Sequence, residues 1–200
     1  MEVQQHGNIY EDLKIQEITG IGKKEYDLLK KNGYTSTHDI TKGIMSDEDV
    51  SIKTTKGNTI NCGDILRRVD SDEYRMIVGQ YRQDGENKVF HTEWTFWFTE
   101  EDKDKLWGRM EKESIQEYVN FVTSIPHGKE SQQETKDQRQ FLKEVTEDKK
   151  ALFSINPKVD SKKQRRVQCS LHIDRLVASG VKYTKKDVNI TINSSKRVFN

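Results

Sequence analysis

The sequence has little of what secreted and membrane proteins carry. Its 200 residues include only two cysteines, Cys62 and Cys169, which are too few for a disulfide framework. Both lie in apolar alternations, which predicts reduced thiols in the core. No apolar run is long enough to cross a membrane, and the polar segment 1–7 lacks the features of a signal peptide. These absences predict a cytoplasmic protein with no membrane partner.

Several kinds of chemistry also lack their sequence signatures. The five histidines and two cysteines are scattered and show no zinc-type spacing. No loop ends in Gly-Lys-Ser or Gly-Lys-Thr, so no nucleotide cofactor is expected. Hydrophobic residues make up only 32% of the chain and charged residues 34%, which indicates a lean core. Three Trp, seven Tyr and seven Phe nevertheless favour a folded protein over a disordered one.

Charge is unevenly distributed, although the whole chain carries a net charge of only +1. Residues 155–200 hold eleven Lys and Arg against three Asp, a net charge of +8. Residues 1–154 hold twenty-three basic and thirty acidic side chains, a net charge of −7. A basic final quarter predicts a polyanionic partner on one face, although a solubilising basic tail would show the same composition.

The order of periodic segments predicts an α/β fold, with α+β as the alternative. Segment 10–42 is helical and compact, 50–98 is rich in strands, and later segments alternate between the two patterns. Mixed strands flanked by helices predict a mixed β-sheet with helices packed on it. The later helices are expected at 100–110, 114–124 and 134–147, and the later strands at 151–156, 167–173 and 188–192.

A β-hairpin is expected around Asp84-Gly85, between the apolar segments 75–81 and 89–98. The second segment includes three side chains of the kind that stack on bases: His91, Trp94 and Trp97. Their place in a hairpin favours packing within the sheet instead.

Near the N-terminus, Gly20-Ile21-Gly22 separates two short helical patterns and is followed by Lys23 and Lys24. The glycines permit a tight turn, and the free N–H groups at the start of the second helix can hold a phosphate oxygen. This pattern resembles the helix-hairpin-helix motif of DNA repair and nuclease proteins. The resemblance implies sequence-independent binding of the DNA backbone, and a helical hairpin used only for packing or a protein contact is the alternative.

The segment 49–53 has a further pattern of interest. Alternate side chains of a β-strand share a face. Asp49, Ser51 and Lys53 are therefore expected on one face and Val50 and Ile52 on the other. A carboxylate and a lysine on one polar face can bind a metal and hold a water molecule, although a half-buried strand with a charged edge has the same spacing.

Segments 51–67 and 156–170 together resemble type II restriction endonucleases of the PD-(D/E)xK class, and the resemblance extends over residues 47–175. It implies a restriction-endonuclease-like core. It also implies hydrolysis of phosphodiester bonds in double-stranded DNA with Mg²⁺, which is held by two acidic residues. In this class a lysine positions or deprotonates the attacking water, while the metal polarises the phosphate.

The functional positions of this class can be assigned to individual residues of this chain. Lys53 matches the lysine of the class, whereas Ser51 stands where an acidic residue is usual. Asp49, one pleat earlier, is a candidate for the missing carboxylate. The first acidic residue is either Asp39, twelve positions before Ser51, or Asp64, which follows the strand. The expected metal ligands are thus drawn from these three aspartates.

A basic strand is expected at residues 164–173. Val167, Cys169, Leu171 and Ile173 alternate with polar side chains, so one face is buried and the other is presented outward. Arginine and glutamine can contact guanine and adenine in the major groove, and lysines can neutralise phosphates. The residues expected to contact DNA here are Lys162, Lys163, Arg165, Arg166 and Gln168.

Together these patterns predict a helix-hairpin-helix-like segment at 1–46 and an endonuclease-like domain at 47–200. Both strands of a duplex have to be cut, so a homodimer is expected. The main alternative is a non-catalytic DNA-binding module that uses the hairpin and the basic strand. A structural protein whose hairpin contacts another protein is a third possibility.

Overall fold

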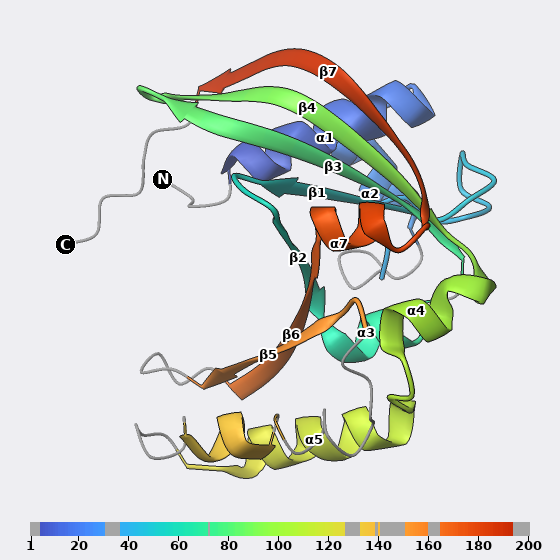
Figure 1. Ribbon diagram of the computed structural model, residues 1–200. Coiled ribbons are helices and arrows are strands. Elements are labelled where there is room, and N and C mark those ends of the chain that lie inside the picture. The colour runs from blue at the N-terminus through green and yellow to red at the C-terminus, as the bar shows by residue number, and fades with distance from the viewer. Residues whose placement is uncertain are drawn as a thin grey trace. The chain divides into compact units, whose positions relative to one another are not determined.

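The computed structural model, shown in Figure 1, describes residues 5–30, 37–71, 73–126, 133–138, 140, 151–159 and 165–193. The chain forms two compact units. The first unit comprises segments 1–60, 73–99 and 180–200, and the second comprises 61–72 and 100–179. The division therefore differs from the predicted one, because residues on both sides of position 46 belong to the first unit.

The first unit contains a four-stranded mixed sheet in the order β1-β3-β4-β7. The β1 and β3 strands are parallel, whereas the β3–β4 and β4–β7 pairs are antiparallel. In Figure 1 the first helix runs alongside this sheet. The elements are α1 (Gln5–Thr19), α2 (Lys23–Leu29), β1 (Val50–Thr55), β3 (Tyr74–Asp84), β4 (Asn87–Phe98) and β7 (Lys182–Asn193).

The second unit is built around a three-stranded sheet in the order β2-β6-β5, whose first strand starts in the first unit. The α5 helix packs against β6 with Ile115, Tyr118 and Val122 buried at helical spacing. The elements are β2 (Thr59–Asp64), α3 (Ile65–Val69), the 3₁₀ helix η2 (Glu100–Asp102), α4 (Lys103–Trp107), α5 (Lys112–Ser124), β5 (Ser154–Val159), β6 (Arg165–His172) and α7 (Ile173–Ala178).

The predicted α/β class is confirmed, since a mixed sheet is flanked by helices. The hairpin is also confirmed. Strands β3 and β4 pair along their whole length, from Tyr74 opposite Phe98 to Asp84 opposite Asn87, and Gly85 in the turn has a positive φ of 56°. The second sheet was not predicted. Of the helix expected at 134–147, residues 134–138 and 140 are helical and the others lie outside the described residues.

Two strand predictions need correction. The last strand, expected to be short at 188–192, is the twelve-residue edge strand β7. The strand expected at 151–156 is β5 at Ser154–Val159, which continues through Pro157, paired with Val167. Proline is tolerated there because β5 is an edge strand, so its missing N–H does not have to bond to a neighbouring strand.

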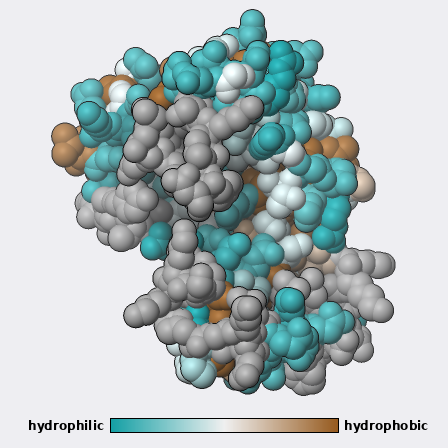
Figure 2. Space-filling model, turned by 90° about the vertical axis from the view of Figure 1, so that its left-hand side faces the viewer, coloured by the Kyte–Doolittle hydropathy of each residue, from teal (hydrophilic) through white to brown (hydrophobic). Residues whose placement is uncertain are grey.

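The face drawn in Figure 2 is mainly hydrophilic over the described residues, with small separate hydrophobic patches. No helix among the described residues has both the length and the apolar character needed to cross a membrane.

A buried carboxylate fastens α1 to the sheet of the first unit. Glu93 is only 3% exposed, and it accepts a hydrogen bond from the Tyr10 hydroxyl at 2.6 Å. The ammonium groups of Lys14 and Lys186 each lie 2.7 Å from it. Burial alone would raise the pKa of Glu93, but the hydrogen bonds from Lys14, Lys186 and Tyr10 outweigh it and lower that pKa.

Close packing supports the same contact. The rings of Tyr10 and Phe90 are stacked with centroids 4.5 Å apart, and they lie over Gly79. A Cβ atom at Gly79 would be 2.5 Å from Tyr10 Cζ and 2.8 Å from Phe90 Cδ1. The glycine is therefore required by lack of space and not by its backbone angle.

Replacing Gly79 with alanine is expected to lower the free energy of unfolding by about 2 kcal/mol, because both buried rings have to shift. Urea denaturation followed by circular dichroism measures this loss. Gly57→Ala is the matched control, since a Cβ there contacts nothing within 4 Å. Equal stability of the two variants would contradict the close-packing account.

Glu93→Gln is expected to lower the free energy of unfolding by about 3 kcal/mol at neutral pH, because it removes the buried counter-ion of Lys14 and leaves that buried ammonium only the exposed Glu17. The pKa of Glu93 is depressed in the folded state, so its stabilisation is present above the ordinary glutamate pKa. The difference between wild type and variant should then shrink as the pH falls below that value. Denaturation curves across an acid series test this, with exposed Glu86→Gln as the control.

Candidate functional site

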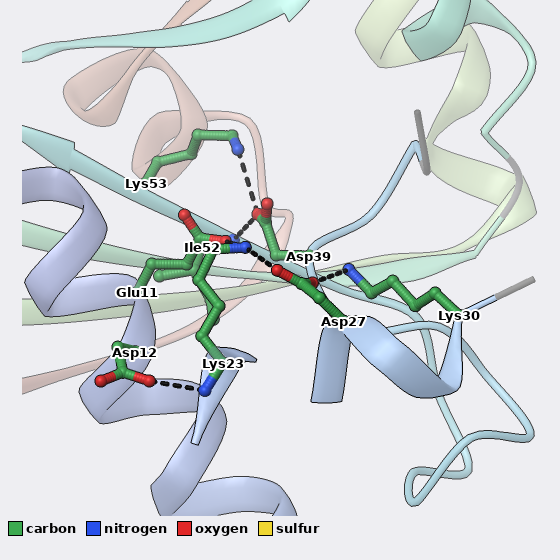
Figure 3. Close-up of polar contacts among 8 residues, drawn as sticks. All are labelled: Glu11, Asp12, Lys23, Asp27, Lys30, Asp39, Ile52 and Lys53. Atoms are coloured by element: carbon green, nitrogen blue, oxygen red, sulfur yellow. Dashed lines mark hydrogen bonds and ion pairs between the residues drawn. The ribbon is translucent and has the colours of Figure 1, made fainter. Parts of the chain in front are cut away.

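The predicted residues Lys53 and Asp39 lie together at the outer edge of β1. The Lys53 ammonium is 3.1 Å from Asp39 Oδ2, and the same oxygen accepts the Ile52 N–H at 2.6 Å (Figure 3). Ile40 forms an antiparallel bridge with Val50, and this bridge holds the adjacent Asp39 beside the strand. Both charged side chains are about one-fifth exposed, so the pair remains accessible to solvent.

A second carboxylate, Glu11 on α1, belongs to the same cluster. Its Oε1 is 3.1 Å from the Lys23 ammonium, which is also 2.8 Å from Asp27 Oδ2. Burial raises the pKa of Glu11, and the charge of Asp39 raises it further, whereas Lys23 and Lys53 act in the opposite direction. Two carboxylates and two ammonium groups therefore share one electrostatic environment, as Figure 3 shows.

Sequence reasoning missed Glu11. A usable signal was its spacing: Glu11 follows the buried Tyr10 and lies one helical turn before the buried Ile15. This spacing places it at the margin of the packed side of α1. The sequence of α1 alone does not show that this margin lies beside β1.

The other predicted carboxylates bind backbone groups elsewhere. Asp49 lies just before β1, and its Oδ1 accepts the Lys42 N–H at 2.8 Å. Asp64 is the N-cap of α3 and accepts the N–H groups of Leu66 and Arg67 at 3.0 and 3.3 Å. Within the described residues, Asp39 is thus the predicted carboxylate that contacts Lys53.

The remaining part of the predicted strand face is only partly accessible. Val50 and Ile52 belong to the hydrophobic core of the first unit, as expected. Ser51, at the position where the restriction-enzyme class has an acidic residue, is fully buried. Lys53 is then the member of β1 that carries an accessible charge at this edge.

The helical hairpin has the predicted form. α1 and α2 are joined at Gly20, whose φ is 80°, and Gly22 is the N-cap of α2. One of the N–H groups expected to be free at the start of this helix is nevertheless bonded. The Lys23 N–H donates to Asp12 Oδ1 at 2.5 Å, because that carboxylate on α1 reaches across the turn (Figure 3). The adjacent Lys24 is exposed.

The basic strand is β6, the central strand of the sheet in the second unit. Its apolar face is buried as predicted, with Val167, Cys169 and Leu171 at most 1% exposed. Arg166 is exposed and Gln168 half-buried, whereas Arg165 Nε donates to the Ile125 carbonyl oxygen at 3.1 Å. Lys162 and Lys163 lie outside the described residues.

No model of a known protein family matches this chain, and no curated protein or solved structure is significantly similar to it. Among the described residues, no group of three or more His, Cys, Asp or Glu is placed to hold a metal ion. The arrangement most suited to chemistry is thus the cluster of Glu11, Lys23, Asp39 and Lys53, which we call the edge cluster.

Asp39→Asn is expected to lower the pKa of Glu11 towards, but not to, its ordinary value, because burial remains after the neighbouring charge is removed. Carbon-detected NMR titration of the side-chain carboxyl groups measures this directly. Asp49→Asn is the matched control, since Asp49 is bonded to the Lys42 backbone and is not among the groups that shift Glu11. An identical Glu11 titration in wild type and Asp39→Asn would contradict the proposed proximity of the two charges.

Proposed function

We propose that this protein is a Mg²⁺-dependent endonuclease that hydrolyses phosphodiester bonds in double-stranded DNA. The observation that carries the proposal is the Lys53 ammonium 3.1 Å from Asp39 at a sheet edge, with Glu11 in the same electrostatic environment. A lysine beside two carboxylates is the residue set of the PD-(D/E)xK class that the sequence resembles, in which the metal polarises the phosphate.

The donor chemistry of the edge cluster fits Mg²⁺. This ion prefers oxygen ligands, keeps several waters, and is often held by one or two carboxylates together with substrate phosphates. Glu11 and Asp39 are two such carboxylates, and the pKa of Glu11 is raised first by burial and then by repulsion from Asp39. A divalent cation would relieve that repulsion. When bound, it would polarise the phosphate and stabilise the leaving oxygen.

The chain's own residues take distinct roles in this proposal. Lys53 would orient the attacking water, because its ammonium group is accessible at the edge of β1. Asp39 would hold Lys53 in place and contribute its carboxylate to the binding of the cation. Glu11 would supply the carboxylate that Ser51 does not, in place of the earlier candidates Asp49 and Asp64.

The DNA contacts remain predictions. The exposed Lys24 beside the hairpin glycines Gly20 and Gly22 is available for a phosphate, whereas the ammonium group of Lys23 is paired with acidic side chains. The set on and before β6, namely Lys162, Lys163, Arg165, Arg166 and Gln168, would contact the target. A homodimer would place one site on each strand of the duplex, so that both strands are cut. We further propose that the protein acts on DNA in the cytoplasm.

One observation favours the second candidate function, a non-catalytic DNA-binding module. Both carboxylates of the edge cluster are neutralised by lysines, Glu11 by Lys23 and Asp39 by Lys53, and the described residues offer no third ligand. In that case the ion pairs only stabilise the fold, and any DNA affinity would come from the surface lysines and arginines.

Incubation with mixed-sequence duplex DNA distinguishes the two functions. We expect fragments with Mg²⁺ and none with EDTA. Lys53→Ala should reduce the cleavage rate at least about a hundredfold while DNA affinity in EDTA is retained, because the lysine acts on the water and not on the bound duplex. Lys56→Ala, an exposed lysine in the following loop, is the control for simple loss of charge. Intact DNA with the wild-type protein and Mg²⁺ would refute the enzyme and leave the binding module.

A further inference from the structure

A row of cross-strand partners extends from the edge cluster across the sheet. Lys53 on β1 pairs with Val78 on β3, Val78 pairs with Trp94 on β4, and Trp94 pairs with Lys185 on β7. Directly paired residues point to the same face of a sheet. Lys53, Trp94 and Lys185 therefore share one face. Neighbouring strands lie about 4.8 Å apart, and β3 lies between β1 and β4. The backbones of Lys53 and Trp94 are therefore about 10 Å apart.

Two aromatic rings and a cation gather at the β7 end of this row. The Lys185 ammonium lies 5.1 Å from the centroid of the Trp94 ring. The Tyr183 ring is 5.9 Å from the Trp94 ring, measured between centroids, and Tyr183 is 40% exposed. Trp94 Nε1 donates to Gln80 Oε1 at 3.2 Å, which fixes the orientation of the indole. Tyr183 and Lys185 are exposed, whereas Trp94 is half-buried and also stacks on the buried Phe96 with centroids 6.1 Å apart. The group therefore offers part of its ring surface and a positive charge to solvent.

We propose that Trp94, Tyr183 and Lys185 form a stacking platform for the bases of a single-stranded nucleic acid segment. Aromatic side chains beside lysines suit unpaired bases, because each base offers a ring face and each phosphate a negative charge. On this face the exposed Lys185 supplies the positive charge that complements a phosphate beside the rings. The inference rests on the proposed function only in linking this platform to cleavage at Lys53.

A partner protein added as a further strand fits this surface less well. β7 is an edge strand, and a neighbouring strand would have to lie beside Lys182, Lys185 and Lys186. Lysines on an exposed edge disfavour such pairing. Stacking on the face of the sheet needs no backbone pairing and uses the lysine charges.

The substrate class follows from the position of the platform. The distance of about 10 Å between Lys53 and Trp94 corresponds to about three nucleotides at the helical rise of one DNA strand. If a phosphate of the strand contacts Lys53, unpaired bases of the same strand would therefore lie near Trp94. The preferred substrate is thus duplex DNA with an adjoining single-stranded tail, rather than a blunt duplex. The predicted packing of Trp94 and Trp97 within the sheet occurs on two different faces, because these two rings lie on opposite faces of β4.

The opposite face provides a matched control. The Lys182 ammonium lies 5.1 Å from the Trp97 ring, the same separation as between Lys185 and Trp94. Lys182 and Lys185 are both exposed on β7 and differ in the face they occupy. Lys182→Gln and Lys185→Gln therefore remove the same charge at the same distance from an indole, but only the second alters the stacking platform.

The test uses the full chain in EDTA, with fluorescence anisotropy of a labelled blunt duplex and of the same duplex carrying a thymidine tail of about ten nucleotides. We expect tighter binding of the tailed duplex. Tyr183→Leu should weaken binding of the tailed duplex roughly tenfold and leave the blunt duplex unchanged, because one stacked base is lost. Tyr183→Phe should retain binding, and Lys185→Gln should weaken it more than Lys182→Gln. Thermal unfolding confirms that each variant is folded.

Equal affinity for tailed and blunt duplexes would overturn the platform, and so would equal losses in Lys182→Gln and Lys185→Gln. Failure of Tyr183→Phe to retain binding would likewise overturn a stacking role. Cleavage is measured separately with Mg²⁺. Tail-dependent binding without any cleavage would support the platform while refuting the endonuclease. Cleavage without tail-dependent binding would support the endonuclease and refute the platform.

Discussion

The carboxylate of Glu93 is the contact on which the placement of the candidate site depends. Its oxygens lie within 2.7 Å of Tyr10, Lys14 and Lys186, so a single buried group joins α1, β4 and β7. Desolvating a carboxylate is costly unless hydrogen bonds and opposite charges surround it, and here they do. Tyr10 can reach this position because residue 79 has no side chain. Glu11 follows Tyr10 directly, so the same anchoring places Glu11 beside β1.

The edge of β1 imposes the second constraint. An edge strand leaves backbone N–H groups without a neighbouring strand, and these groups need partners. Asp39 bonds the Ile52 N–H and the Lys53 ammonium with one oxygen, so it completes the backbone and fixes a charged side chain together. A neutral side chain at position 39 could serve the backbone but would not hold the ammonium as strongly. The local fold and the proposed chemistry therefore require the same acidic residue.

Local patterns in the sequence were sufficient where the structure depends on near neighbours. The Asp84-Gly85 turn predicted the β3–β4 hairpin, and the alternation from Val167 to Leu171 predicted which face of β6 is buried. Asp39 and Lys53 were also correctly suggested as neighbours, since the intervening chain returns to β1 through the Ile40–Val50 bridge. In each case the contact is made within a short stretch of chain.

Contacts between distant segments were not predictable in this way. Alternation shows which face of a strand is buried but not which strand lies beside it, so the second sheet was missed. β7 was underestimated because its first six residues, Lys182–Asp187, are polar and exposed, without the apolar alternation of a half-buried strand. Asp12 filling the start of α2 depends on how two helices cross, which no residue pattern in either helix specifies.

The edge cluster also explains why a division of the chain by sequence order fails. Asp39 falls in the predicted hairpin segment and Lys53 in the predicted endonuclease domain, yet they are bonded and belong to one compact unit. Lys23 at the hairpin turn is bonded to Glu11, and the pKa of Glu11 responds to both Asp39 and Lys53. Any anion that contacts Lys23 would therefore act on the same set of charges that includes Asp39 and Lys53. The hairpin and the strand edge are thus one electrostatic site and not two modules joined by a linker.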